Sequence, residues 1–198
     1  MRGRVQRECC DEWRARAARL HERTLALPET PALDRSAAPD AWSAAQVLEH
    51  LVLASGSYLA VMRQRVETAA GSDVHDPRWR PTVAGRLLAR SMVSARRFPA
   101  PRGWRPPLGP RPHVREAWAS ELRELDALIE RAADAPWNRL RFGSPAAALL
   151  RLNLGDGFLI LVTHAERHHG QIDRALAAAG TEGASPVSAD PARTERRT

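Results

Sequence analysis

Apolar residues recur at helical spacing along almost the whole chain. In the first segment they stand three or four positions apart, at Val5, Cys9, Trp13, Ala17 and Leu20. This period predicts a helix over Val5–Leu27, which Pro28 and Pro31 then end. β-branched residues are sparse and no stretch alternates steadily between apolar and polar positions, so we expect no strands.

A second helix has a clear start signal. Ser43 and Gln46 form the S-x-x-Q capping box, in which two side chains satisfy backbone N–H groups at the helix start. The apolar stripe behind this box consists of Val47, Leu48, Leu51, Tyr58, Leu59 and Met62. We expect this helix to run to about Ala69, before Gly71.

Two further long helices are expected in the second half of the chain. The first spans Val114–Ala133, and its core face is made of Trp118, Leu122, Leu125, Leu128 and Ile129. The next turn is marked by Pro136, Gly143 and Pro145. The last helix is expected over Asn153–Ala179, with Asp156 as a capping partner at its start and Gly180 as the C′ residue.

Residues 71–113 differ from the rest of the chain. They carry many of the prolines, and a short helix is expected inside them over Val83–Arg97. The segment is too long for a plain bundle loop, so we interpret it as a crossover connection that packs over the bundle as a cap. The prediction is therefore all-α, a four-helix bundle forming one domain over residues 1–180, with 181–198 as a disordered tail.

Composition limits the class of protein. The chain has 198 residues, of which 43% are hydrophobic and 27% charged, which is typical of a globular domain. The longest apolar run, Phe158–Val162, is too short to span a bilayer, and the N-terminus has no apolar signal region. We expect a cytoplasmic protein with no membrane partner. Cys9 and Cys10 are adjacent, which excludes a disulfide framework and a zinc finger built on spaced cysteine pairs.

The net charge is +7, and all thirty basic residues are arginine. A basic chain is compatible with nucleic-acid binding. However, the arginines are spread along the chain and mixed with acids, as in Glu121–Glu124, and no basic tract alternates with aromatic residues. We therefore interpret the charge as a solvated surface and expect no nucleic-acid partner.

Three histidines form the main candidate site. His164 and His168 are four residues apart, which turns a helix by about 400° and leaves both side chains on one face. Two imidazoles at this spacing can bind one metal ion. His50 lies near the start of the second apolar stripe, and it adds a third nitrogen if the second and fourth long helices pack side by side. Three neutral ligands leave coordination positions open, as in catalytic metal sites.

The pair His164 and His168 also has a plainer interpretation, in which one histidine is buried and hydrogen-bonded and the other is solvated. The sequence is not the H-E-x-x-H motif of zinc metalloproteases, because Ala165 follows His164 and Glu166 points to nearly the opposite side of the helix. Gln171 lies on the same face, one turn beyond His168. We expect it to bond a ligand residue or a metal-bound water.

The neighbours of this motif leave alternatives open. Gly170 costs about 1 kcal/mol inside a helix, which indicates either close approach of another element or substrate, or simple tolerance near a helix end. His169 is rotated by about 100° from His168, so we interpret it as a helix-surface or interface residue. The remaining histidines are assigned to the surface or to loops, with His21 either exposed or lining the bundle cavity; they are His21, His75 and His113.

Two stretches carry a family resemblance. Trp42–Leu51 reads W-S-A-A-Q-V-L-E-H-L and resembles the start of the second helix in the DinB-like (DinB/YfiT) superfamily. His164–Ile172 reads H-A-E-R-H-H-G-Q-I and is similar to that family's fourth-helix motif, H-x-x-x-H-x-G-Q-I. The resemblance covers about residues 5–180, including the crossover.

The resemblance implies a four-helix bundle, often a homodimer, with a Zn or Ni site at His50, His164 and His168. Relatives include S-transferases and isomerases that use mycothiol or bacillithiol, and also metal-dependent hydrolases. It favours a divalent-metal-dependent enzyme for thiol transfer or hydrolysis on a small molecule, with a low-molecular-weight thiol as a further cofactor. Gln171 and Arg167 are the residues expected to assist in cofactor binding. The alternative is a non-catalytic metal- or small-molecule-binding bundle.

Overall fold

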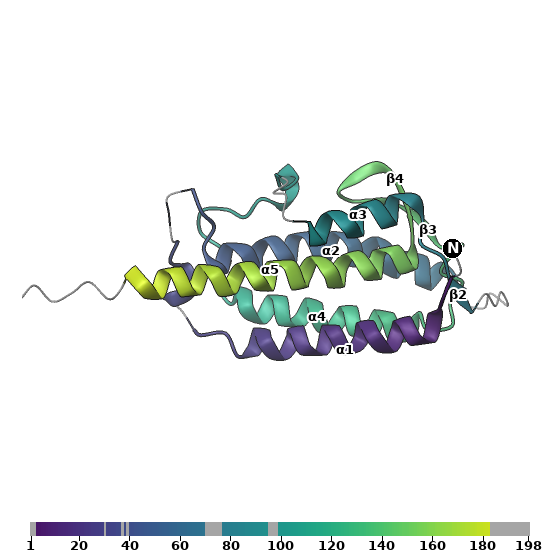
Figure 1. The fold of residues 1–198 in the computed structure, drawn as a ribbon, viewed down its shortest axis with the longest axis horizontal. Coiled ribbons are helices and arrows are strands. Elements are labelled where there is room, and N and C mark those ends of the chain that lie inside the picture. Colours follow the sequence, from purple (N-terminus) through teal and green to yellow (C-terminus); the bar gives the residue numbers. More distant parts are fainter. Residues whose placement is uncertain are drawn as a thin grey trace, which may run out of the picture.

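The protein is described from a computed structural model, which covers residues 3–29, 31–36, 38, 40–69, 77–94 and 99–182. It is an all-α bundle with two small β-sheets at one end (Figure 1). In chain order the elements are β1 (Arg4–Val5), α1 (Gln6–Leu25), the 3₁₀ turn η1 (Ala32–Asp34), α2 (Ala44–Thr68), β2 (Arg78–Trp79), α3 (Val83–Val93), η2 (Arg102–Trp104), α4 (Val114–Arg131), β3 (Arg141–Ser144), β4 (Ala147–Asn153) and α5 (Leu154–Glu182).

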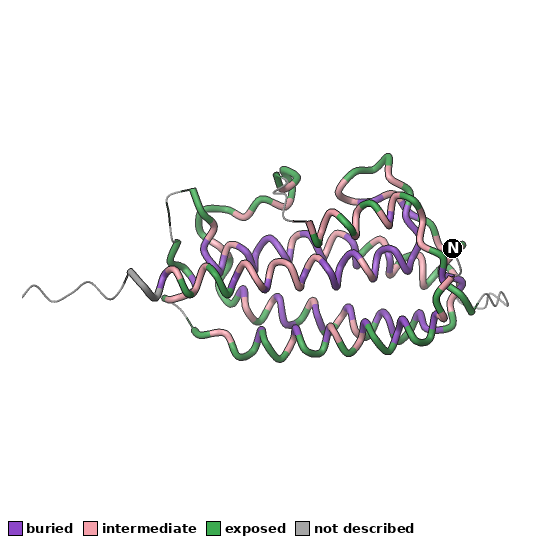
Figure 2. Tube along the Cα trace, in the orientation of Figure 1, coloured by how far each residue is buried: buried purple, intermediate pink, exposed green. Residues whose placement is uncertain are grey.

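Four long helices make the bundle. Helix α1 packs against α4 and α5, and α2 packs against α4 and α5 from the other side, so each long helix has two neighbours. Helix α3, from the crossover, lies outside this ring and packs on α5. The buried positions face the inside of the bundle along its whole length (Figure 2). The predicted bundle with a short extra helix in its crossover is confirmed.

The predicted start signals form as expected. Ser43 Oγ accepts from the backbone N–H of Gln46 at 3.2 Å, and the Ser43 N–H donates to Gln46 Oε1 at 3.0 Å, which completes the capping box. At the start of α5, Asn153 Oδ1 accepts from the Asp156 N–H and Asp156 Oδ2 accepts from the Asn153 N–H, both at 3.0 Å. These caps set where α2 and α5 begin, and therefore where their histidines lie.

Aromatic side chains close the end of the bundle that carries the sheets. Trp13 of α1 stacks on Trp137 with ring centroids 5.5 Å apart, and it meets the edge of Trp79 at 5.1 Å. All three indoles are buried. The second part of the core lies towards the other end, where Leu48 and Leu51 of α2 pack near Trp118 and Ile172. Cys9 and Cys10 are buried and unbridged, as small helix residues.

The expectation of no strands was wrong. Strands β3 and β4 form an antiparallel hairpin in which Phe142 pairs with Leu152, and both side chains are buried. The Tyr58 hydroxyl lies 2.7 Å from Ser144 Oγ and ties the hairpin to α2. The sequence pattern hides this hairpin because only two apolar positions face the core and the register shifts after Gly143. Strands β1 and β2 add a second, two-residue pairing.

Several helix ends also differ from prediction. Helix α1 ends at Leu25 rather than Leu27, and α3 ends at Val93 rather than Arg97. Gly180 is not a C′ residue, because α5 continues through it to Glu182. Helix α5 therefore extends over 181–182, the first two residues of the predicted tail. The rest of that tail, 183–198, lies outside the described residues.

Within the described residues, α2 is the one helix long and apolar enough to cross a membrane by length and composition. Of its apolar window, 67% is buried inside the protein. Since its stripe packs against α4 and α5, the apolar character of α2 is explained by its place in the core.

Candidate metal centre

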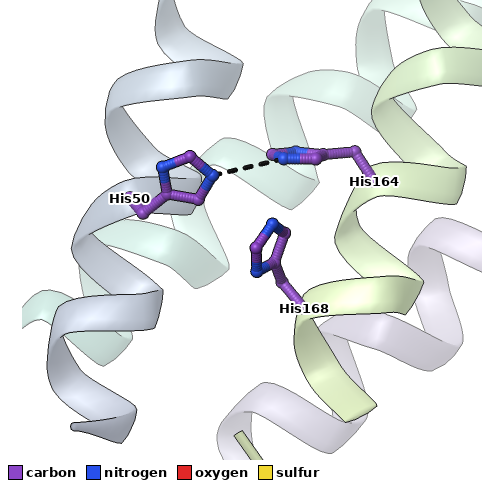
Figure 3. Close-up of side chains that lie close together, drawn as sticks. All are labelled: His50, His164 and His168. Carbon is purple, nitrogen blue, oxygen red and sulfur yellow. Dashed lines mark hydrogen bonds between the residues drawn. The ribbon is translucent and has the colours of Figure 1, made fainter. Parts of the chain in front are cut away.

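His50 on α2 faces His164 and His168 on α5 (Figure 3). One ring nitrogen from each lies within 4.8 Å of the others, and the Nε2 atoms of His50 and His164 are 3.2 Å apart. Nitrogens bound to one tetrahedral zinc at about 2.0–2.1 Å are separated by about 3.3 Å. The separation of His50 and His164 matches this spacing, and the three nitrogens together are close enough to hold a metal ion.

Local structure positions the three rings. His164 and His168 are one helical turn apart, and their ring centroids are 4.5 Å apart. The third ring comes from the first half of α2, seven residues after its Ser43 cap, and its centroid lies 4.7 Å from that of His168. The packing of α2 on α5 joins the two halves of the site.

Hydrogen bonds orient two of the rings. Nδ1 of His50 lies 2.8 Å from the backbone carbonyl oxygen of Trp104, and because a carbonyl only accepts, Nδ1 carries the hydrogen. In the same way Nδ1 of His168 donates to Gln171 Oε1 at 2.9 Å. Both contacts leave the Nε2 lone pair for a metal, which is the usual arrangement around ligand histidines. Gln171 thus contacts His168, one of the two roles the sequence suggested for it.

Burial keeps the cluster neutral. Desolvation lowers the pKa of His50 and, to about 3, that of His168. The pKa of His164 is also lowered well below its usual value, first by desolvation and then by the neighbouring His168. Because a metal competes with protons for the same lone pairs, these shifts favour metal binding at neutral pH.

Two carboxylates that are close to the ligand histidines in the chain, Glu166 and Glu49, are paired with arginines. Glu166 receives two hydrogen bonds from Arg16, at 2.8 and 2.6 Å, so it points away from the cluster as predicted. Glu49, next to His50 in the chain, is held by Arg111 in a two-pronged contact with distances of 2.8 Å. Neither is placed as a general base at the three histidines.

Arg167 lies beside the cluster but serves a neighbouring helix. Its Nη1 donates to the carbonyl oxygen of Met92 at 2.9 Å and also to that of Ser94, at the C-terminal end of α3. The guanidinium therefore satisfies carbonyls that lack a partner within the helix. Assistance to an anionic thiol, which the sequence suggested for Arg167, stays a prediction.

His169 lies in a helix interface rather than on an outer surface. It is buried, and its Nε2 accepts from the Trp118 indole N–H at 3.1 Å, with Thr24 Oγ1 at 3.3 Å. Among the described residues, an added Cβ on Gly170 meets only the flexible end of Arg174, at 3.5 Å. Close approach of another element was therefore wrong among the described residues and simple tolerance fits, whereas close approach of a substrate stays a prediction.

The other histidines stay away from the cluster. His21 is half-buried on α1, with its Nε2 3.5 Å from Arg123, and His113 is exposed at the start of α4. His75 lies outside the described residues. These placements agree with the surface assignment for His21 and His113.

The contribution of the crossover to the site was not predictable from the sequence. Beside the Trp104 carbonyl, Gln46 Nε2 donates to the Pro107 carbonyl at 3.1 Å, and Arg111 pairs with Glu49. Residues 104–111 are therefore attached to the first turns of α2 at three points. A backbone carbonyl carries no signal in the sequence, and Glu49 and Arg111 are 62 positions apart.

Comparison with known proteins agrees with this architecture. A family model described as the DinB superfamily matches residues 12–172, a range that includes all three histidines and the crossover. No curated protein and no solved structure gives a significant match to the chain.

Proposed function

The chain belongs to the DinB superfamily, and on this basis we propose that it is a divalent-metal-dependent enzyme whose ion is held by His50, His164 and His168. The observation that carries the proposal is the convergence of three imidazole nitrogens within 4.8 Å, two of them on rings oriented by hydrogen bonds. Zinc and nickel both suit imidazole ligands.

A divalent ion held by three neutral ligands acts as a Lewis acid and lowers the pKa of a bound thiol or water. The protein's own residues set the conditions for this chemistry. Trp104 and Gln171 hold two rings in the tautomer that presents Nε2. The Trp42 ring, with its centroid 5.2 Å from that of His50, adds an apolar wall. We propose thiol transfer or hydrolysis on a small-molecule substrate, with a low-molecular-weight thiol as the anionic partner.

One observation favours a second function, a non-catalytic metal- or small-molecule-binding bundle. Glu49 and Glu166, the carboxylates that neighbour the ligand histidines along the chain, are both paired with arginines. A hydrolase needs a group that accepts a proton from the attacking water. Thiol transfer does not need it once the thiol is ionised, so the same observation makes transfer the better of the two reactions.

The test is metal content of the untagged protein, with and without incubation in zinc or nickel. We expect about one ion per chain in the wild type and loss of at least about 90% in His164→Ala and His168→Ala, since either leaves two ligands. His21→Ala is the matched control, because it removes a histidine outside the cluster and should keep the metal.

The loaded protein is then assayed for thiol transfer and ester or amide hydrolysis. Turnover that disappears with the metal supports the enzyme. Stoichiometric metal without turnover on either panel supports the binding bundle. Wild-type protein that takes up no metal contradicts both.

A further inference from the structure

Helix α3 and the β3–β4 hairpin form a second surface with an unusual character, here called the α3–hairpin face. The two elements are in contact, and they lie on the same side of the bundle, opposite α1 (Figure 1). Large aliphatic side chains are exposed to solvent on this face: Val83 is 64% exposed, Leu87 63% and Leu149 97%. The tip of the hairpin is drawn as exposed in Figure 2.

Helix α3 carries apolar residues on both its inner and its outer side. On the inner side Ala84 and Leu88 pack against the core, and Gly85 is buried so closely against α5 that a Cβ there lies 2.2 Å from the Asp156 carboxylate. Val83 and Leu87, one turn apart, face outward instead. Exposed apolar patches rimmed by polar residues mark sites of protein or membrane interaction.

The same face is strongly basic. Residues 77–94 and 135–155, which include α3 and the hairpin, contain seven arginines and not one aspartate or glutamate. The exposed members are Arg78, Arg80, Arg90, Arg139, Arg141 and Arg151. Three aspartates border these segments along the chain: Asp134 is exposed and pairs with Arg7, Asp156 is buried beneath the start of α3, where it accepts from Thr82, and Asp76 lies outside the described residues. The face therefore carries a positive field with apolar side chains inside it.

A hollow of about 410 Å³ opens at the N-terminal end of α3. Three arginines line it, Arg80, Arg86 and Arg141, together with Thr82, Asn138 and the exposed Val83. Guanidinium groups are the preferred side-chain partners of phosphate oxygens. Cationic and aliphatic groups thus meet at one place.

Contrary to the expectation from the sequence of no membrane partner, we propose that the α3–hairpin face docks onto membrane surfaces that contain anionic phospholipids. The arginine-lined hollow takes the headgroup phosphate, and Val83, Leu87 and Leu149 enter the boundary of the acyl chains. Peripheral binding of this kind combines buried apolar area with electrostatic attraction, and both components are present. The proposal does not depend on the metal centre, which lies on the facing surfaces of α2 and α5.

Two other occupants fit less well. A second copy of the chain, docked face to face, brings arginine against arginine with no carboxylate from these segments to pair with it. Nucleic acid accounts for the charge but not for the exposed aliphatic residues, since bases stack on aromatic rings. Anionic lipid accounts for both features.

The experiment is co-sedimentation of the full chain with vesicles of phosphatidylcholine alone or with 30% phosphatidylglycerol, at about 0.15 M salt, where surface charge still acts. Two double variants are compared with wild type: Leu87→Ser with Leu149→Ser, and Arg141→Glu with Arg151→Glu. All four side chains are exposed. The controls are Leu108→Ser, which removes a leucine that is 98% exposed on the crossover, and Arg19→Glu, which reverses a charge on α1.

We expect binding to the anionic vesicles only, weakened at least about tenfold in each double variant and unchanged in the controls. Two results would overturn lipid docking in favour of a general polyanion site. One is vesicle binding that the serine variant retains in full. The other is equally strong binding of the wild type to a duplex oligonucleotide, lost only in the glutamate variant. Lipid docking is also overturned, in favour of a second copy, if the wild type forms a concentration-dependent dimer and does not bind vesicles, while the serine variant stays monomeric.

Discussion

The carbonyl oxygen of Trp104 lies 2.8 Å from Nδ1 of His50, so the backbone of the crossover determines which nitrogen of this histidine faces His164. Trp104 is 54 positions away from His50 in the chain. Arg111 holds the crossover in this position through its ion pair with Glu49, the residue next to His50. The segment that looked like a cap is thus part of the support of the candidate metal centre.

Arg111→Ala should loosen this support. The Glu49 side chain is 5% exposed, so removal of its partner leaves a buried carboxylate unpaired and lowers the free energy of unfolding by about 1–3 kcal/mol. Because the Trp104 carbonyl is on the same segment, we also expect zinc affinity to fall about tenfold. Chemical denaturation of the apo-protein and zinc titration measure the two effects.

The control for Arg111→Ala is Arg102→Ala, which removes an exposed arginine from the same segment. This variant should keep both the free energy of unfolding and the zinc affinity of the wild type. A loss of stability in Arg111→Ala with unchanged zinc affinity contradicts the role of the crossover in orienting His50.

Gln171→Ala should weaken metal binding without a large effect on the fold. The Gln171 side chain is half-buried, and its contact with His168 Nδ1, at 2.9 Å, orients a ring rather than filling the core. Loss of such a partner costs about 10–100-fold in metal affinity. Gln171→Glu, which can accept the same hydrogen bond, should restore most of it. Equal zinc affinities in wild type and Gln171→Ala contradict this role.

His169 should make the apo-protein sensitive to acid. Burial lowers the pKa of folded His169 to about 4, whereas an unfolded histidine titrates near 6.5. Between these values the unfolded chain binds a proton that the folded chain does not, so stability falls as pH drops through this window. One such histidine costs about 2 kcal/mol at pH 5 relative to pH 8.

Urea unfolding at pH 8 and pH 5, with metal removed by a chelator, checks this. The replacement His169→Gln keeps an acceptor for the Trp118 N–H and removes the titrating group. The difference in the free energy of unfolding between pH 8 and pH 5 should therefore shrink by about 2 kcal/mol. An unchanged difference shows that His169 does not contribute to acid sensitivity.

Gly85→Ala should separate α3 from the bundle. A Cβ at this position lies 2.2 Å from the Asp156 carboxylate, which is fixed by bonds from Thr82 and from the Asn153 N–H. Overpacking of this kind costs about 1–3 kcal/mol, or about 2–4 °C in Tm per kcal/mol for a chain of this size. The control is Gly103→Ala, where a Cβ meets no atom of the other described residues within 4 Å, and it should keep the wild-type Tm.

Local sequence signals were sufficient to predict the helices and the half of the metal site that lies on α5. The capping box at Ser43 and the pair Asn153 and Asp156 act within four residues, so the starts of α2 and α5 were predictable. His164 and His168 share a face through helix geometry alone. The hairpin was missed because Phe142 and Leu152 are too few positions to show a period of two, and Gly180 was misassigned because α5 continues past it.

Relations between distant residues were decided by the tertiary structure. It brings His50 to within 3.2 Å of His164, engages Arg167 with the carbonyls of α3, and buries His169 against Trp118. It also gathers two acid-free segments into one basic and apolar face, although the arginines look evenly mixed with acids along the chain. Helix periods and caps act through neighbouring residues and are readable from the sequence, whereas the packing of one helix on another depends on all the contacts at once.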